Sequence, residues 1–243
     1  MFITCLGVFG PYPSASGATS GYLAGSGNSL ALLDCGSGVV SRLMRFASPL
    51  DLSALVISHW HYDHMSDIFV LGYLLQSANK TLPLIAPEAP ESIKALLSSL
   101  PFKLINIETA DKIGDMAFSA VKTRHPVTSF AVKLKAEGAT LVYTGDAQDS
   151  SNLFPFCEDA DVLLCDAAFL DAYRKENAPH MSARMAAELA KKTKGAKLIL
   201  THFIPGTDLD ALRMEAAKIY KNTSLAEENK RFEIASNERA ELP

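Results

Sequence analysis

The chain has 243 residues, of which 48% are hydrophobic, and a formal net charge of −4 at pH 7. The hydrophobic content supports a large core, whereas the acidic balance excludes a bulk positive field that would attract nucleic acid. No apolar run approaches the roughly 20 residues of a membrane-spanning helix, so we expect no membrane partner.

The predicted elements alternate between strands and helices. The segment Met1 to Gly7 has no basic region and is followed by Pro11 and Pro13, so it predicts a first strand rather than a signal peptide. Strands are predicted near residues 2–9, 20–25, 30–34, 54–57, 83–86, 103–107, 116–123, 128–135, 140–144, 162–165 and 197–201, with a last one within 230–236. Helices are predicted near 38–47, 65–77, 89–99, 182–193 and 208–220. This order indicates an α/β protein without repeats.

The four cysteines predict buried, reduced thiols. Cys5, Cys35, Cys157 and Cys165 show no C-x-x-C spacing, and three of them lie in apolar, strand-like settings. Reduced thiols are typical of a cytoplasmic protein, and we expect that location here.

Three histidines and an aspartate lie within six residues, at His59, His61, Asp63 and His64, directly after the apolar strand predicted at 54–57. Residues i and i+2 of an extended segment point to the same side, so His59 and His61 can hold one metal ion together. Asp63 and His64 turn into the next helix and could hold a second ion. Nitrogen and oxygen ligands favour zinc, and Mn²⁺ or iron accepts a similar set.

Four ligands leave two ions under-coordinated, so later residues must complete the site. The remaining histidines are His125, His180 and His202, and each follows or opens a predicted element. Asp146 also ends a strand, in the run Thr144-Gly145-Asp146. An aspartate at such a position could bridge two cations and hold them roughly 3.5–4 Å apart.

These residues carry a resemblance to a known family. The motif HxHxDH reads His59-Trp60-His61-Tyr62-Asp63-His64, followed by His125, Thr144-Gly145-Asp146 and Thr201-His202-Phe203. Across nearly its whole length, the chain resembles hydrolases of the metallo-β-lactamase fold. The ribonuclease Z-like phosphodiesterase branch of this family has a further histidine that opens a helix, and His180 resembles that histidine. The resemblance implies an αββα sandwich of two mixed β-sheets flanked by helices. We expect a single domain over residues 1–243, because the candidate ligands span positions 59 to 202.

The resemblance also implies a role for each side chain. One zinc ion would be held by His59, His61 and His125, and the other by Asp63, His64 and His202, with Asp146 bridging the two. His180 is similar to the histidine that protonates the leaving group. Asp166 matches an acidic residue near the site that is not usually a ligand. Asp166 and Asp34 are candidates to bond the second ring nitrogens of the metal histidines.

Each of these residues also has a purely structural interpretation. Residues 59–64 could form a solvated loop or bind a structural metal, and His125 and His202 could be core histidines whose hydrogen bonds are satisfied. Asp146 could be a turn residue, His180 a helix-start residue and Asp166 a cap or turn residue. The joint appearance of the cluster and its downstream partners favours the metal site.

One segment departs from the tRNA-trimming ribonuclease Z enzymes, which usually carry a long basic arm that grips the RNA. In common bacterial forms the arm lies between the third metal histidine and the bridging aspartate. Here only 20 residues separate His125 from Asp146, and they predict a hairpin of residues 127–135 and 140–144 that turns at Glu137-Gly138. The chain is therefore expected to be an arm-less relative.

We expect a dinuclear-zinc hydrolase, a phosphodiesterase that cleaves a small or cyclic phosphodiester or a short RNA with a metal-bound hydroxide. Asp63 would orient that hydroxide, and His180 would protonate the leaving alkoxide. Three alternatives stand beside it: a 3′ tRNA-processing endoribonuclease, an ester, thioester or lactam hydrolase on the same metals, and a non-enzymatic sensor module. The expected partner is a small phosphodiester or short nucleic acid, and assembly into a homodimer is left open.

Overall fold

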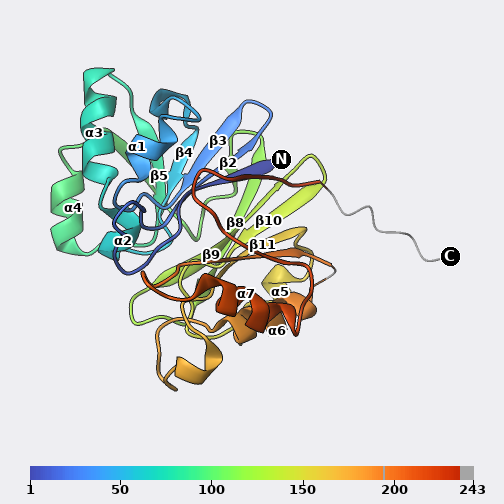
Figure 1. Ribbon diagram of the computed structural model, residues 1–243. Helices are drawn as coiled ribbons and strands as arrows, with labels where there is room; N and C mark the ends of the chain where they lie inside the picture. Colours follow the sequence, from blue (N-terminus) through green and yellow to red (C-terminus); the bar gives the residue numbers. More distant parts are fainter. Residues whose placement is uncertain (194, 236–243) are drawn as a thin grey trace.

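Two seven-stranded sheets face each other across a shared apolar core, and helices cover the outer face of each sheet (Figure 1). This computed structural model describes residues 1–193 and 195–235. Both sheets mix parallel and antiparallel pairs. The layer order confirms the predicted αββα sandwich.

The first sheet holds the N-terminal part of the chain and the last described strand. Its order is β14 (Arg231–Glu233), β1 (Phe2–Gly7), β2 (Gly21–Ser26), β3 (Ser29–Leu33), β4 (Ala54–Val56), β5 (Leu82–Ala86) and β6 (Phe102–Asn106). The outer face of this sheet is covered by α1 (Val39–Leu43), α3 (Ile68–Ser77) and α4 (Glu91–Leu97). Their buried side chains, such as Leu43 and Leu71, join Leu55 of β4 in a second apolar cluster.

The second sheet holds the central and C-terminal parts of the chain. Its order is β13 (Thr223–Leu225), β12 (Lys197–Thr201), β11 (Val162–Asp166), β10 (Ala139–Tyr143), β9 (Ser129–Ala136), β8 (Met116–Thr123) and β7 (Lys112–Ile113). Its outer helices are α5 (Phe154–Cys157), α6 (Ala183–Lys191) and α7 (Leu209–Ala217). Ser182 caps α6 by accepting a hydrogen bond from the amide of Met185.

The parallel strands place polar residues at one edge of the sandwich. All residues of β4 and β11 are buried, and so are all residues of β12 except the first. Such burial is expected of parallel strands that are covered on both faces. A candidate site residue lies at or just beyond the carboxyl end of each strand: His59 after β4, Asp166 at the end of β11 and His202 after β12. Ligand sites of α/β proteins gather at such carboxyl ends.

Most predicted elements are confirmed, with differences at short or interrupted segments. The predicted helix at 65–77 is two helices, α2 (Tyr62–Met65) and α3, because the backbone amide of Asp67 donates to the carbonyl of Cys35 at 2.9 Å instead of continuing the helical ladder. The strands β7 and β13 and the helix α5 are not predicted, because segments of two to four residues show no periodicity. The predicted strand within 230–236 is β14, and Ser236 lies outside the described residues.

The hairpin between His125 and Asp146 forms as predicted. β9 and β10 pair antiparallel, and the two turn residues Glu137 and Gly138 have φ values of 54° and 75°. Two consecutive positive φ angles are the geometry of a tight two-residue hairpin turn. All residues between His125 and Asp146 are therefore accounted for by two strands and short connections.

The cysteine prediction is also confirmed, since all four thiols are free and buried. Burial raises the pKa of the Cys5 thiol to about 12, so it stays protonated. Among the helices in the described ranges, none combines the length and apolar character that a bilayer crossing requires.

Candidate metal centre

The segment after β4 presents the histidine cluster at the edge of the first sheet. His59 is fully buried, and His61 is still extended, with a ψ of 149°, because it is the N-cap residue of α2. Asp63 and His64 lie on that four-residue helix. The change from extended to helical backbone between His61 and Tyr62 divides the four side chains into two pairs, as the sequence spacing predicts.

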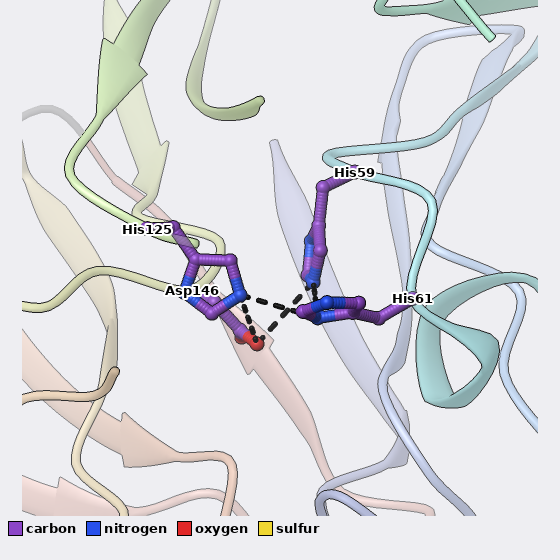
Figure 2. Close-up of side chains that lie close together, drawn as sticks. All are labelled: His59, His61, His125 and Asp146. Atoms are coloured by element: carbon purple, nitrogen blue, oxygen red, sulfur yellow. Dashed lines mark hydrogen bonds and ion pairs between the residues drawn. The ribbon is translucent and has the colours of Figure 1, made fainter. Parts of the chain in front are cut away.

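The first group joins His59 and His61 to His125 and Asp146, which lie in loops that follow β8 and β10 of the second sheet (Figure 2). The His61 Nδ1 atom lies 3.0 Å from His59 Nε2 and 3.2 Å from His125 Nε2. The Asp146 Oδ2 atom lies 3.4 Å from His59 Nε2 and 3.9 Å from His125 Nε2. One atom from each residue therefore points at a common centre.

The second group joins Asp63, His64 and His202, all buried. The His202 Nε2 atom lies 3.3 Å from both His64 Nε2 and Asp63 Oδ2. Asp146 reaches this group too: its Oδ2 lies 3.3 Å from His64 Nε2, and its Oδ1 lies 3.4 Å from His202 Nε2. Asp146 is thus the residue shared by both groups.

The donor set fits two cations better than it fits mutual hydrogen bonding. A neutral imidazole has one N–H, so ring nitrogens that face each other in threes cannot all be satisfied by one another. The Oδ1 atom of Asp146 is buried and accepts no hydrogen bond. Tetrahedral zinc with bonds of about 2.0–2.1 Å places its ligand atoms roughly 3.3–3.4 Å apart, and most of the distances above are close to that value.

The charge states of the groups support the same interpretation. Burial, followed by the neighbouring His64, lowers the pKa of His59 well below its ordinary value, which leaves a neutral ring with a free lone pair. Burial disfavours the charge of Asp146, but His202, His64 and His59 outweigh it and hold its pKa well below the ordinary value. Burial also opposes the charge of His64, yet Asp146 and Asp34 raise its pKa well above 6.5, which reflects the concentrated negative charge there.

Outer contacts fix the orientation of the ligand rings. Asp34 is the partner of His64, with Oδ2 2.8 Å from Nδ1. The sequence alone does not indicate which histidine Asp34 would bond. Two further rings have an outer partner: Ser58 Oγ lies 3.0 Å from His59 Nδ1, and the Pro179 carbonyl lies 3.1 Å from His125 Nδ1. Such partners set the tautomer and raise the basicity of the coordinating nitrogen.

The Asp34 carboxylate accepts hydrogen bonds from donors of both sheets. It accepts hydrogen bonds from the Ser58 amide at 2.7 Å, from Ser58 Oγ at 2.8 Å and from the Tyr143 hydroxyl at 2.8 Å. Asp34 has a φ of 58°, a left-handed conformation that aspartate tolerates better than most residues. Neither Ser58 nor Tyr143 is predicted from the sequence, because their role depends on how the two sheets pack.

The contact between Tyr143 and Asp34 predicts an effect on metal affinity. Tyr143→Phe removes one hydrogen bond to a buried carboxylate, and Asp34→Asn also weakens its hold on His64. We expect zinc affinity to fall by roughly 10–100-fold for Asp34→Asn and by less for Tyr143→Phe. Competition titration against a chromophoric chelator measures both. Tyr220→Phe is the matched control, because its hydroxyl bonds the backbone carbonyl of Ala196 instead; unchanged affinity in Asp34→Asn would contradict the assigned role.

His180 lies at the edge of the two groups and is held by Asp166. Its Nδ1 lies 3.0 Å from Asp166 Oδ2, and the ring stacks on His202 with centroids 4.5 Å apart. Burial lowers the pKa of His180, but Asp166 and then Asp146 outweigh it and raise the pKa from 6.5 to about 9. Because Asp166 occupies Nδ1, the Nε2 atom is the one free to meet a substrate.

Gly10 provides a close approach that the sequence does not predict. A Cβ atom there would lie 2.1 Å from Cε1 and Nε2 of His202, so only glycine fits against this ring. The strand edges around it are joined by hydrogen bonds from the Gly10 amide to Phe203 and from the Phe203 amide to Val8. His202 has a φ of 63°, which turns its ring toward the centre after β12.

Comparisons with known proteins agree with this geometry. Residues 31–203 match the profile of the Beta-lactamase superfamily domain. The chain is 34% identical over 229 residues to the probable metallo-hydrolase YhfI of Bacillus subtilis (strain 168), covering 90% of this chain and 94% of YhfI. It is 26% identical over 297 residues to Ribonuclease Z of Methanosarcina acetivorans, covering 96% and 97% of the two chains.

Solved structures show the same architecture. The crystal structure of the metallo-β-lactamase fold protein YhfI from Bacillus subtilis aligns with a TM-score of 0.90 and 32% identity, covering 95% of this chain and 98% of that one. The short form of human tRNase Z aligns with a TM-score of 0.79 and 20% identity over 97% of this chain and 100% of that one, which shows a shared fold.

Proposed function

Since the chain belongs to the metallo-β-lactamase fold family and is a metal-dependent hydrolase, we propose that it is a dinuclear-zinc phosphodiesterase acting on a small or cyclic phosphodiester or a short RNA. The family resemblance drawn from the HxHxDH motif is confirmed, and the sensor alternative is set aside. The observation that carries the phosphodiesterase proposal is His180, held 3.0 Å from Asp166 beside the two ligand groups.

The proposed residue roles follow from position and charge. His59, His61 and His125 would hold one cation, Asp63, His64 and His202 the other, and Asp146 would bridge them. Bound there, the cations would polarise a phosphoryl oxygen, neutralise developing charge and lower the pKa of water to about 7. Asp63 retains 8% side-chain exposure against 2% for Asp146, so it is the ligand carboxylate better placed to orient an attacking water.

His180 would supply the proton that an alkoxide leaving group needs. Asp166 accepts from Nδ1 and also from the amide of Ala147 at 3.1 Å, so the ring is fixed with Nε2 directed away from it. Proton transfer from a positioned acid typically contributes 10²–10⁴-fold to the rate. Hydrolysis of a lactam or simple ester has less need of this second acid, and a panel of chromogenic esters tests that alternative.

A second candidate is 3′ tRNA processing, favoured by the 26% identity to Ribonuclease Z of Methanosarcina acetivorans. The β9–β10 hairpin occupies the stretch between His125 and Asp146, which leaves no room there for an RNA-gripping arm. A gel assay with precursor tRNA at physiological salt decides between the two. Cleavage at micromolar RNA or below would favour tRNA processing over the small-substrate proposal.

The direct test of the proposal is metal-dependent phosphodiester hydrolysis. We expect the purified protein to hydrolyse bis(p-nitrophenyl) phosphate with zinc or manganese, to lose that activity on treatment with a chelator, and to regain it when metal is returned. The reason is that the two ligand groups would hold the cations that activate the phosphodiester and the attacking water. Full activity in excess chelator, or no activity in the zinc-loaded protein on any phosphodiester, would contradict the proposal.

A further inference from the structure

A pocket borders the metal centre on the side of His180. It has a volume of about 440 Å³ and is lined by Phe169, Tyr173, Lys175, Asn177, Ala178 and Pro179, which we call the Tyr173 pocket. Pro179 directly precedes His180, and its carbonyl lies 3.1 Å from His125 Nδ1. The loop that lines the pocket therefore also contacts a candidate ligand, and a molecule held at the metal centre could extend into the pocket.

Two aromatic residues, Phe169 and Tyr173, line this pocket and are partly or largely exposed. The Tyr173 residue is 77% exposed, a high value for a large hydrophobic residue, and no other ring within residues 1–193 and 195–235 stacks on it. The Phe169 ring lies 6.3 Å from that of His180. Both aromatic residues also line a second cavity of about 410 Å³, which includes Ile204. A flat group in either cavity would therefore contact these two aromatic residues.

The backbone that carries Tyr173 is fixed relative to His180. Tyr173 ends the short 3-10 helix η2 (Asp171–Tyr173), and the amide of Asp171 is bonded to Glu215 at 3.0 Å. The next residue, Arg174, donates from Nε to the carbonyl of His180 at 2.8 Å and from its guanidinium to that of Gln148 at 2.7 Å. A pocket held this way loses little entropy when it binds a ligand.

We propose that the Tyr173 pocket binds a planar aromatic group of the substrate, such as a nucleobase, while its phosphodiester lies at the metal centre. This inference rests on the proposed function and narrows its substrate class. The volume lies within the range of small-molecule sites, which combine apolar walls with a few polar groups. The amide of Asn177 can donate to and accept from a base edge, and Tyr173 offers a stacking face.

The test compares two monophosphates that differ only in the base. Binding of adenosine 5′-monophosphate and of ribose 5-phosphate to the zinc-loaded protein is measured by calorimetry, with inorganic phosphate as competitor. Base–aromatic stacking predicts that the nucleotide binds roughly 5- to 150-fold more tightly than ribose 5-phosphate. Tyr173→Ala should remove most of that preference without weakening ribose 5-phosphate binding, and Tyr173→Phe should retain it.

The control is Tyr73→Ala, which removes another exposed tyrosine, 68% exposed on α3; it should keep the full preference. Equal affinity of the two monophosphates for the wild-type protein overturns the aromatic pocket but leaves the phosphodiesterase proposal standing. Failure of both compounds to compete with phosphate overturns both proposals together. A preference that survives in Tyr173→Ala also contradicts the inference.

Discussion

Replacing His64 with alanine is expected to abolish hydrolysis of bis(p-nitrophenyl) phosphate. His64 Nε2 lies 3.3 Å from His202 Nε2 and 3.3 Å from Asp146 Oδ2, so its loss removes a donor from the centre of the second group. The loss should exceed the roughly 10–100-fold that changes in outer contacts usually cause. Steady-state kinetics at saturating zinc measure it, and unchanged turnover would defeat the proposed site.

Fold damage must be separated from loss of metal in this variant, because His64→Ala also leaves Asp34 buried without its histidine. A cation that binds only the folded state raises its stability by mass action. We therefore expect zinc to raise the thermal midpoint of the wild-type protein and to raise that of His64→Ala much less. A variant that is folded in chelator, yet neither stabilised by zinc nor active, identifies His64 as a ligand.

The second large effect is expected at His180, where alanine should lower kcat by roughly 10²–10⁴-fold on a substrate with an alkoxide leaving group. The loss should be much smaller on bis(p-nitrophenyl) phosphate, since p-nitrophenolate departs without a proton. Asp166→Asn should show the same dependence on the leaving group, because Asp166 holds Nδ1 of His180. Comparing the two substrate types in each variant provides the measurement.

The metal content of His180→Ala is the control, because the ring of His180 stacks on that of His202, 4.5 Å away. His180, Asp146 and His202 also form a third group that could hold an ion. We expect the variant to bind as much zinc as the wild type. Loss of a metal equivalent, or an equal rate loss on both substrate types, would make His180 a ligand rather than an acid.

The parts of the site that the sequence predicts are those encoded by short-range spacing. His59, His61, Asp63 and His64 are adjacent in the chain, and the extended-to-helical change at His61 assigns them to two sides. The order of strands and helices was also predictable wherever a run was long enough to show a period. Distant residues such as His125 and His202 are candidates because four ligands cannot complete two metal sites, and the family resemblance assigns each of them to one of the two ions.

The rest depends on packing between elements that are far apart in sequence. Tyr143 reaches Asp34 only because the two sheets face each other, and these residues are separated by 109 positions. Gly10 is required only because the His202 ring lies against it. No local pattern carries such information. Tyr173 lies outside every predicted element, so no periodic pattern indicates its place in a pocket lined by residues between 169 and 179.

The most direct test of the two-cation site is the zinc content of the protein after reconstitution and desalting, measured by elemental analysis in wild type and in Asp146→Ala. We predict two zinc ions per chain in the wild type and fewer than two in the variant, because Asp146 contacts both ligand groups. Less than one equivalent in active wild-type protein, or two equivalents in the variant, would contradict it.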